Sequence, residues 1–230
     1  MTRRSLLLLA AASPEISPDE LAQFSVGQRD ARLLTLREWM FGEQIESVVS
    51  CPKCSERLEL MFDVADIRAR NDSENSPPGA TYLLQLDGYE VRFRPPNSTD
   101  LEAIVKCQNA AAARDRILAR CALEIKRGNA KDNAKKRVDQ LPSKIVNALV
   151  EKMAQVDPQA NVQLSLKCPA CQYGWSATFD IASFLWSELN DWAERILREI
   201  HLIASAYGWH ESDILEMSAE RRSCYLEMIR

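Results

Sequence analysis

The residues best suited to chemistry are four cysteines in two Cys-x-x-Cys pairs, Cys51 with Cys54 and Cys168 with Cys171. A Cys-x-x-Cys turn presents two thiolates on one side of a tight turn, and two such turns supply the four sulfurs of a tetrahedral structural zinc site. Four cysteines leave no open position for water or substrate, so the pattern indicates a structural rather than a catalytic metal. We therefore expect one Zn²⁺ per chain, bound by all four residues.

The sequence around the first pair is repeated around the second. A strand-like run precedes each pair, at 45–49 and 162–166, and a Phe-Asp dipeptide begins eight positions after each second cysteine, at 62–63 and 179–180. The two pairs are separated by 113 residues, whereas the halves of a compact zinc ribbon lie about 15–20 residues apart. The pattern predicts two β-hairpins of one zinc ribbon, split by a large insertion.

Other uses of these cysteines explain the sequence less well. Two unrelated disulfides or buried thiols would explain the pairs but not their matching flanks. A thioredoxin-like redox role requires a Cys-x-x-Cys at the start of a helix in a βαβ unit, and neither pair has that context. The remaining cysteines, Cys107, Cys121 and Cys224, are interpreted as small buried hydrophobic residues, with Cys107 and Cys121 on one face of a helix. The histidines His201 and His210 are interpreted as a helix-surface residue and a turn residue.

Composition narrows the classes of function. The chain has 230 residues, is 46% hydrophobic and carries a formal net charge of −4. This charge argues against non-specific binding of nucleic acid or membrane as the main role, and no stretch reaches the apolar length of a transmembrane helix. Seven cysteines, four of them in metal-type pairs, are typical of a reducing cytoplasm. Residues 6–12 follow two arginines as in a short signal peptide, but we expect them to form the first helix of the fold.

Periodicity and turn residues predict the elements between and around the hairpins. We expect helical structure from about 5 to 40, with Ser17 as an N-cap, and polar loops at 71–79 and 128–137. Asp87-Gly88 between two alternating runs predicts a hairpin of 82–86 with 89–94. Two helices are expected to follow, from about 100 to 127 and from about 143 to 156.

The C-terminal region is predicted to be helical. A helix over about 181–206 is expected to bury the stripe Ile181, Leu185, Trp192, Ile196, Ile200 and Ile203. It breaks at Gly208 and is followed by short helices over about 211–217 and 219–229. Trp, Tyr and Arg side chains commonly anchor protein interfaces, and the partner-binding candidates of this type are Tyr207, Trp209, Arg221, Arg222 and Tyr225. The alternative is that Trp209 and Tyr225 only pack this segment onto the long helix.

The resulting fold class is α+β. It is mostly helical, with a zinc-ribbon-like module formed by two Cys-x-x-Cys β-hairpins and a small hairpin in the insertion. The predicted organisation is an N-terminal helical segment (1–43), the split zinc-ribbon module (44–66 and 161–181), an inserted hairpin-plus-helices subdomain (67–160) and a C-terminal helical segment (182–230).

Several segments taken together resemble a known family. They include Gly27 to Leu34, the first cysteine pair, Asp87 to Pro95, the second pair with Phe179-Asp180-Ile181, and the region from Glu199 through Tyr225-Leu226. The chain resembles the baseplate hub assembly chaperones of T4-type contractile phages, in the version found with contractile injection systems and phage-like tails. The resemblance implies a non-enzymatic assembly factor or structural component that contacts baseplate or tail proteins, located in the host cytoplasm or incorporated into the particle.

Two further functions stay open at this stage. A zinc-ribbon nucleic-acid-binding or regulatory protein is the main alternative, and the basic residues between Lys126 and Lys136 would support it. A hydrolase ranks third, because the sequence contains no glycine-rich phosphate loop, no Gly-x-Ser-x-Gly nucleophile turn and no metal-binding histidine pair.

Overall fold

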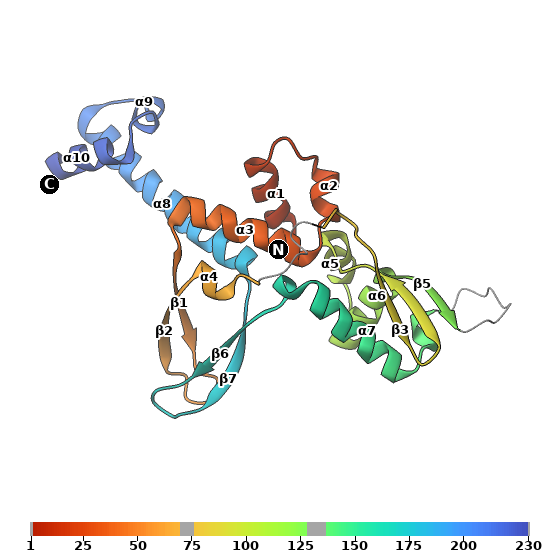
Figure 1. The fold of residues 1–230 in the computed structure, drawn as a ribbon. Helices are drawn as coiled ribbons and strands as arrows, with labels where there is room; N and C mark the ends of the chain where they lie inside the picture. Colours follow the sequence, from red (N-terminus) through yellow and green to blue (C-terminus); the bar gives the residue numbers. More distant parts are fainter. Residues whose placement is uncertain (1, 70–75, 128–136, 230) are drawn as a thin grey trace. The chain divides into compact units, whose positions relative to one another are not determined.

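The computed structural model describes residues 2–69, 76–127 and 137–229. It divides into two compact units, Met1–Ala182 and Ser183–Arg230 (Figure 1). Residues 71–75 and 128–136, which are most of the polar loops expected at 71–79 and 128–137 and most of the basic run 126–136, lie outside the described residues. Helices and antiparallel strands alternate along the first unit, and this confirms the α+β class.

The N-terminal segment is helical as predicted, and it consists of three helices, with a break at Ser25 in addition to the one expected before Ser17. They are α1 (Thr2–Ala12), α2 (Pro18–Gln23) and α3 (Val26–Phe41). Ser17 caps α2 as predicted. The chain then breaks at Ser25, whose hydroxyl accepts from the backbone N–H of Gln28 while the Gln28 side chain accepts from the N–H of Ser25. This reciprocal capping box starts a new helix, which ends at Gly42 with φ 86°.

Both predicted Cys-x-x-Cys hairpins are present. The first consists of β1 (Gln44–Ser50) and β2 (Arg57–Asp63), and the second of β6 (Val162–Lys167) and β7 (Gly174–Phe179). Each is antiparallel, with Ile45 opposite Phe62 in the first and Val162 opposite Phe179 in the second. Positions 45 and 62 of the first hairpin correspond to positions 162 and 179 of the second, 117 residues later in each case. The two hairpins therefore have the same strand register.

The repeat extends beyond the hairpins. A helix precedes each one, α3 from residue 26 and α7 (Ser143–Val156) from residue 143, again 117 positions apart. A helix also follows each one, α4 (Val64–Ile67) after Asp63 and α8 (Ile181–Tyr207) after Asp180. The Asp180 carboxylate accepts from the backbone N–H of Ala182 at 3.0 Å, which satisfies a free donor of the first helical turn. The chain therefore contains the same helix–hairpin–helix arrangement twice, and the last helix of the second copy, α8, continues from the first unit into the second.

The insertion contains a three-stranded antiparallel sheet in the order β3-β4-β5. Within the insertion, the elements that precede α7 are β3 (Tyr82–Leu86), β4 (Tyr89–Phe93), α5 (Ser98–Ile104), α6 (Ala110–Cys121), β5 (Ala122–Arg127) and η2 (Val138–Gln140). The short helix η3 (Pro158–Ala160) follows α7. The hairpin predicted around Asp87-Gly88 is confirmed, and both turn residues have positive φ. Val91, Phe93, Leu118 and Leu149 are buried in the core between this sheet and helices α6 and α7.

The prediction of a single helix from about 100 to 127 was wrong. Asn109 starts a separate helix by accepting from the backbone N–H of Ala112 at 2.8 Å, and the chain turns to strand after Cys121. Residues 122–127 pair with β4, as with Val91 opposite Ile125. Cys107 therefore lies between two helices, and it does not share a helix face with buried Cys121.

One buried joint connects the two copies of the repeat. The Asp157 carboxylate accepts from the Ser25 hydroxyl at 2.9 Å and from the Gly27 backbone N–H at 3.0 Å, at the start of α3. Burial raises the pKa of Asp157, and these two hydrogen bonds oppose that rise. Two residues further on, the Gln159 side chain donates to the Ile67 carbonyl and accepts from the Ala69 N–H. The segment leading into the second hairpin thus holds both ends of the first copy.

The second unit consists of the long helix α8 from Ser183 onward, with α9 (Glu211–Leu215) and α10 (Ala219–Ile229). Its core is Ile200, Ile203 and Ile214. Of the stripe predicted for the long helix, Trp192 is 44% exposed, so its assignment to the core was wrong. No helix among the described residues is long and apolar enough to cross a lipid bilayer.

The joint at Gly27 leads to a testable prediction. A Cβ on Gly27 would lie 2.1 Å from Asp157 Oδ1 and 2.9 Å from the Ala160 backbone nitrogen. We expect Gly27→Ala to lower the free energy of unfolding by about 2 kcal/mol and Tm by about 4–8 °C. The matched control is Gly174→Ala, whose nearest atom would be the Leu166 carbonyl oxygen at 3.9 Å. Equal thermal melting of the two variants would contradict the proposed close contact.

Candidate metal centre

The two cysteine turns are built by the same backbone hydrogen bonds. The carbonyl of Cys51 accepts from the N–H of Ser55 at 2.9 Å, and the carbonyl of Cys168 accepts from the N–H of Gln172 at 2.9 Å. The N–H of each first cysteine then donates to the carbonyl five positions later. These bonds close each turn on itself and direct its two thiols to one side.

Both turns place a non-glycine residue in the left-handed region at the same point. Ser55 has φ 62° and Gln172 has φ 59°. This conformation costs a non-glycine residue about 1 kcal/mol, and such strain persists where the surrounding structure imposes it. Its recurrence in both copies shows that the turn geometry belongs to the motif and does not arise from one local sequence.

The four sulfurs form one compact cluster. All four Sγ atoms lie within 4.8 Å of one another. The Cys51 and Cys171 sulfurs are 3.7 Å apart, and the Cys54 and Cys168 sulfurs are 3.6 Å apart. A tetrahedral zinc with Zn–S bonds of about 2.3 Å has S–S edges of about 3.8 Å, whereas a disulfide bond is about 2.05 Å long. The cluster thus fits a tetrahedral metal ion.

Thiol ionisation in the cluster is strongly interdependent. Desolvation raises the pKa of Cys51, but hydrogen bonds from the backbone N–H groups of Cys54 and Lys53 bring that pKa down to about 7. For Cys54, the Glu56 N–H lowers the pKa, but the neighbouring thiols, that of Cys171 first, raise the pKa to about 12. One thiolate therefore forms readily near neutral pH and discourages the next. A divalent cation removes this obstacle by neutralising the sulfurs together.

Aromatic side chains join the two hairpins at both ends of their strands. Phe62 and Phe179, which occupy equivalent positions in the two copies, meet edge to face with ring centroids 5.7 Å apart. Near the turns, the Lys53 ammonium lies 5.8 Å from the centroid of the Tyr173 ring, which stacks on Trp175. The repeated Phe-Asp dipeptide indicated that Phe62 and Phe179 occupy equivalent positions, whereas no pattern in the sequence predicted the contact of Lys53 with Tyr173.

The remaining cysteines and the histidines lie away from this cluster in the sequence and do not contribute to it. Cys121 is buried, and burial followed by the charge of Asp100 raises the pKa of its thiol to about 12. Cys224 is exposed on α10, so the expectation that it is buried was wrong. His201 is exposed on α8, and His210 is the N-cap residue of α9, as the sequence indicated.

The five partner-binding candidates lie together in the second unit. The rings of Tyr207, Trp209 and Tyr225 contact one another, with centroids 4.8–5.5 Å apart. Trp209 and Tyr225 pack against the isoleucine core. Arg222 is buried, pairs with Glu199 at 3.1 Å and donates to the Met217 carbonyl. Tyr207 and Arg221 are exposed, and a role of this cluster in partner binding stays a prediction.

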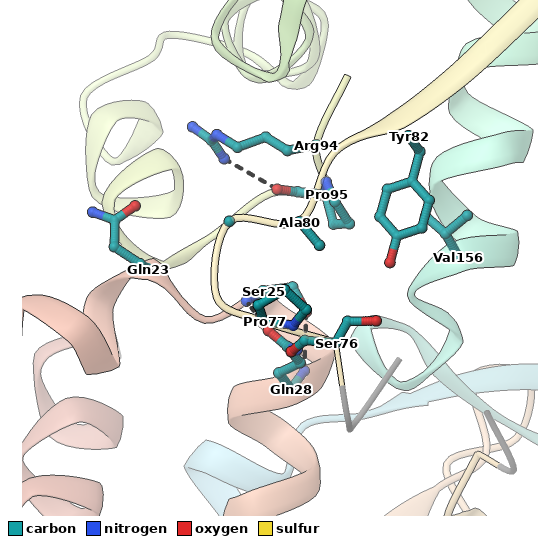
Figure 2. A pocket seen from close by; sticks show the side chains of 11 residues that line it. Gln23, Ser25, Gln28, Ser76, Pro77, Ala80, Tyr82, Arg94, Pro95 and Val156 are labelled. Atoms are coloured by element: carbon teal, nitrogen blue, oxygen red, sulfur yellow. Dashed lines mark hydrogen bonds between the residues drawn. The ribbon is translucent and has the colours of Figure 1, made fainter. Parts of the chain in front are cut away.

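A small cavity lies beside the start of α3. It has a volume of about 20 Å³, room for about one water molecule. Figure 2 shows Gln28 and Ser76 on one side and Tyr82 and Arg94 on the other. Arg94 donates to the Pro95 carbonyl within it, and Gln28 donates to the Ser76 carbonyl. These two hydrogen bonds fix the backbone at Ser76 and Pro95 in the wall of the cavity.

The cysteine cluster leads to a prediction about metal content. Wild-type protein should contain about one zinc per chain, and Cys51→Ser or Cys168→Ser should lose it during purification, because an ion held by three sulfurs and a water is bound more weakly than one held by four sulfurs. Cys224→Ser, an exposed cysteine outside the cluster, serves as the control and should keep its metal. Elemental analysis by mass spectrometry measures the ratio. Zinc retained by both cluster variants, or absent from the wild type, would contradict the assignment.

Comparison with known proteins identifies the family. A family model described as T4 bacteriophage base plate protein matches residues 9–186. No curated protein and no solved structure matches the chain. The matched region contains both cysteine pairs and ends before Tyr207, so the C-terminal part of the resemblance noted in the sequence lies outside it. The match covers well over half of the chain, and the protein therefore belongs to the T4 bacteriophage base plate protein family.

Proposed function

We propose that the protein is a non-enzymatic assembly factor or structural component of a contractile phage-tail or injection-system baseplate, acting through protein–protein contacts. The observation that carries this proposal is the baseplate family match, which spans both hairpins and the whole insertion between them.

We propose zinc as the metal in the cysteine cluster. Thiolate ligands favour zinc or iron–sulfur clusters, and the S–S distances of 3.6 and 3.7 Å fit a single tetrahedral ion. Zinc is redox-inert and forms closed four-sulfur structural sites. Its role here would be to fix the two hairpins against each other.

A metal clip suits this scaffold for a physical reason. An isolated two-stranded hairpin is marginally stable at best, and each Cys-x-x-Cys hairpin pairs with no third strand among the described residues. The insertion between the pairs is 113 residues long, and closing so long a loop costs chain entropy. Metal binding offsets this cost, because the site forms only in the folded state.

We place the protein in the host cytoplasm, where thiolates remain reduced, with baseplate or tail proteins as its partners. An assembly factor would leave the particle, whereas a structural component would stay in it. The family match is compatible with both, and the fate of the protein after assembly distinguishes them.

The cluster of Tyr207, Trp209 and Tyr225 belongs to this proposal as a partner contact. The exposed members, Tyr207 and Arg221, would touch the partner. Trp209, Tyr225 and Arg222 would shape the surface, because they pack against the isoleucine core or pair with Glu199.

The function is tested by deleting the gene in cells that produce the particle. We expect deletion to abolish complete contractile tails in electron micrographs, because the baseplate would be missing a part or an assembly step. Wild-type protein should restore them, Cys51→Ser should not, and Cys224→Ser should. Immunoblots of purified particles then separate component from assembly factor. Normal tails in the deletion strain would contradict the proposal. Purified protein that is retained on a DNA column and binds no baseplate protein would also contradict it.

Substitution of two adjacent arginines distinguishes a residue that contacts a partner from a residue that stabilises the fold. Arg222→Ala should lower the free energy of unfolding by about 2 kcal/mol, because Glu199 loses its mostly buried partner. Arg221→Ala should change stability by less than about 0.5 kcal/mol but weaken co-purification with baseplate proteins. Thermal melting and affinity purification measure the two effects. An Arg221→Ala protein that retains every partner would remove Arg221 from the proposed contact.

A further inference from the structure

The outward face of the second hairpin is a polar ladder typical of a solvent-facing sheet. Gln163 Nε2 donates to Thr178 Oγ1 at 2.9 Å, and the Ser176 hydroxyl donates to Gln163 Oε1 at 2.9 Å. Ser165 and Lys167 continue this exposed face along β6. The side chains satisfy one another or face water, so this hairpin folds with no apolar residue on that face.

The first hairpin carries different residues at the equivalent positions. Glu46, Val48, Glu59 and Met61 stand 117 positions before Gln163, Ser165, Ser176 and Thr178. Val48 is 53% exposed and Met61 is 67% exposed. In the strand register Val48 lies opposite Glu59, and Met61 lies opposite Glu46. The two apolar side chains are therefore diagonal neighbours on one face, and each has a carboxylate directly across from it.

This difference needs an explanation outside the fold. Single exposed apolar residues are ordinary, but here two adjacent ones replace a serine and a threonine that serve the same hairpin equally well. Large exposed apolar patches rimmed by polar residues mark interaction sites, and Val48 with Met61 form a small apolar surface with such a rim. The remaining residues of this face are Gln44 and Asp63 at one end and Ser50 with Arg57 at the turn end. The charge around the apolar pair is thus mainly negative.

We propose that Val48 and Met61, with Glu46 and Glu59, form a docking face for a segment of a baseplate protein that presents an apolar side chain between lysine or arginine residues. This inference rests on the proposed function for the identity of the partner. Complementary charge selects such a partner. A second copy of this chain is disfavoured, because two such faces would bring four glutamates together.

The test compares equivalent positions of the two hairpins in the full chain. A photo-crosslinking amino acid is placed at position 48 or at position 165 in cells that assemble the particle. We expect position 48 to crosslink to one segment of a baseplate protein with an apolar residue flanked by Lys or Arg, and position 165 not to. Crosslinking to a second copy, to an acidic segment, to nothing, or equally from both positions would overturn the proposal.

A peptide of the crosslinked segment then measures affinity. The double variant Val48→Ser with Met61→Thr carries the residues of the second hairpin, so its metal content and Tm should match wild type. We expect its affinity for the peptide to fall about tenfold or more, and Glu46→Gln with Glu59→Gln to reduce the salt dependence of binding. Unchanged affinity in the first variant would overturn the docking face while leaving the baseplate role intact. Wild-type protein that co-purifies with no baseplate protein would instead contradict that role.

Discussion

The first unit depends on four cysteine sulfurs held within 4.8 Å of one another. Four thiolates at this distance repel one another, and a divalent cation bound between them offsets that repulsion by attracting each one. A cation held by all four would connect residues more than 110 positions apart. The two hairpins carry the centre directly, and helices α3 and α4 adjoin the first hairpin within two residues.

The protein meets this requirement by using one supersecondary unit twice. Both copies close their cysteine turns with the same hydrogen bonds and the same left-handed residue, and Phe62 meets its counterpart Phe179. The buried contact of Asp157 with the start of α3 provides a second, metal-independent connection between the copies. The inner faces of the two hairpins contact each other, as Phe62 and Phe179 do. The outer faces are not bound by this requirement, and they carry different residues.

The predictability of each feature follows from the range of the interactions that create it. The cysteine hairpins and the Asp87-Gly88 turn were predictable because turn chemistry is local. The strand at 122–127 was missed because its helical neighbour is alanine-rich and its pairing partner, β4, lies about 30 residues earlier. The fit of Gly27 against Asp157, and the burial of Arg222 beside exposed Arg221, depend on residues that meet only in the folded chain. No local pattern encodes such contacts.

Amide hydrogen exchange with and without a chelator tests the central claim most directly, because it reports on each hairpin separately. If one metal joins both hairpins, its removal should increase exchange in β1–β2 and in β6–β7 together, with the same dependence on chelator concentration. Readdition of zinc should restore protection to both. Loss of protection in only one hairpin, or unchanged exchange after the metal is demonstrably gone, would contradict the account.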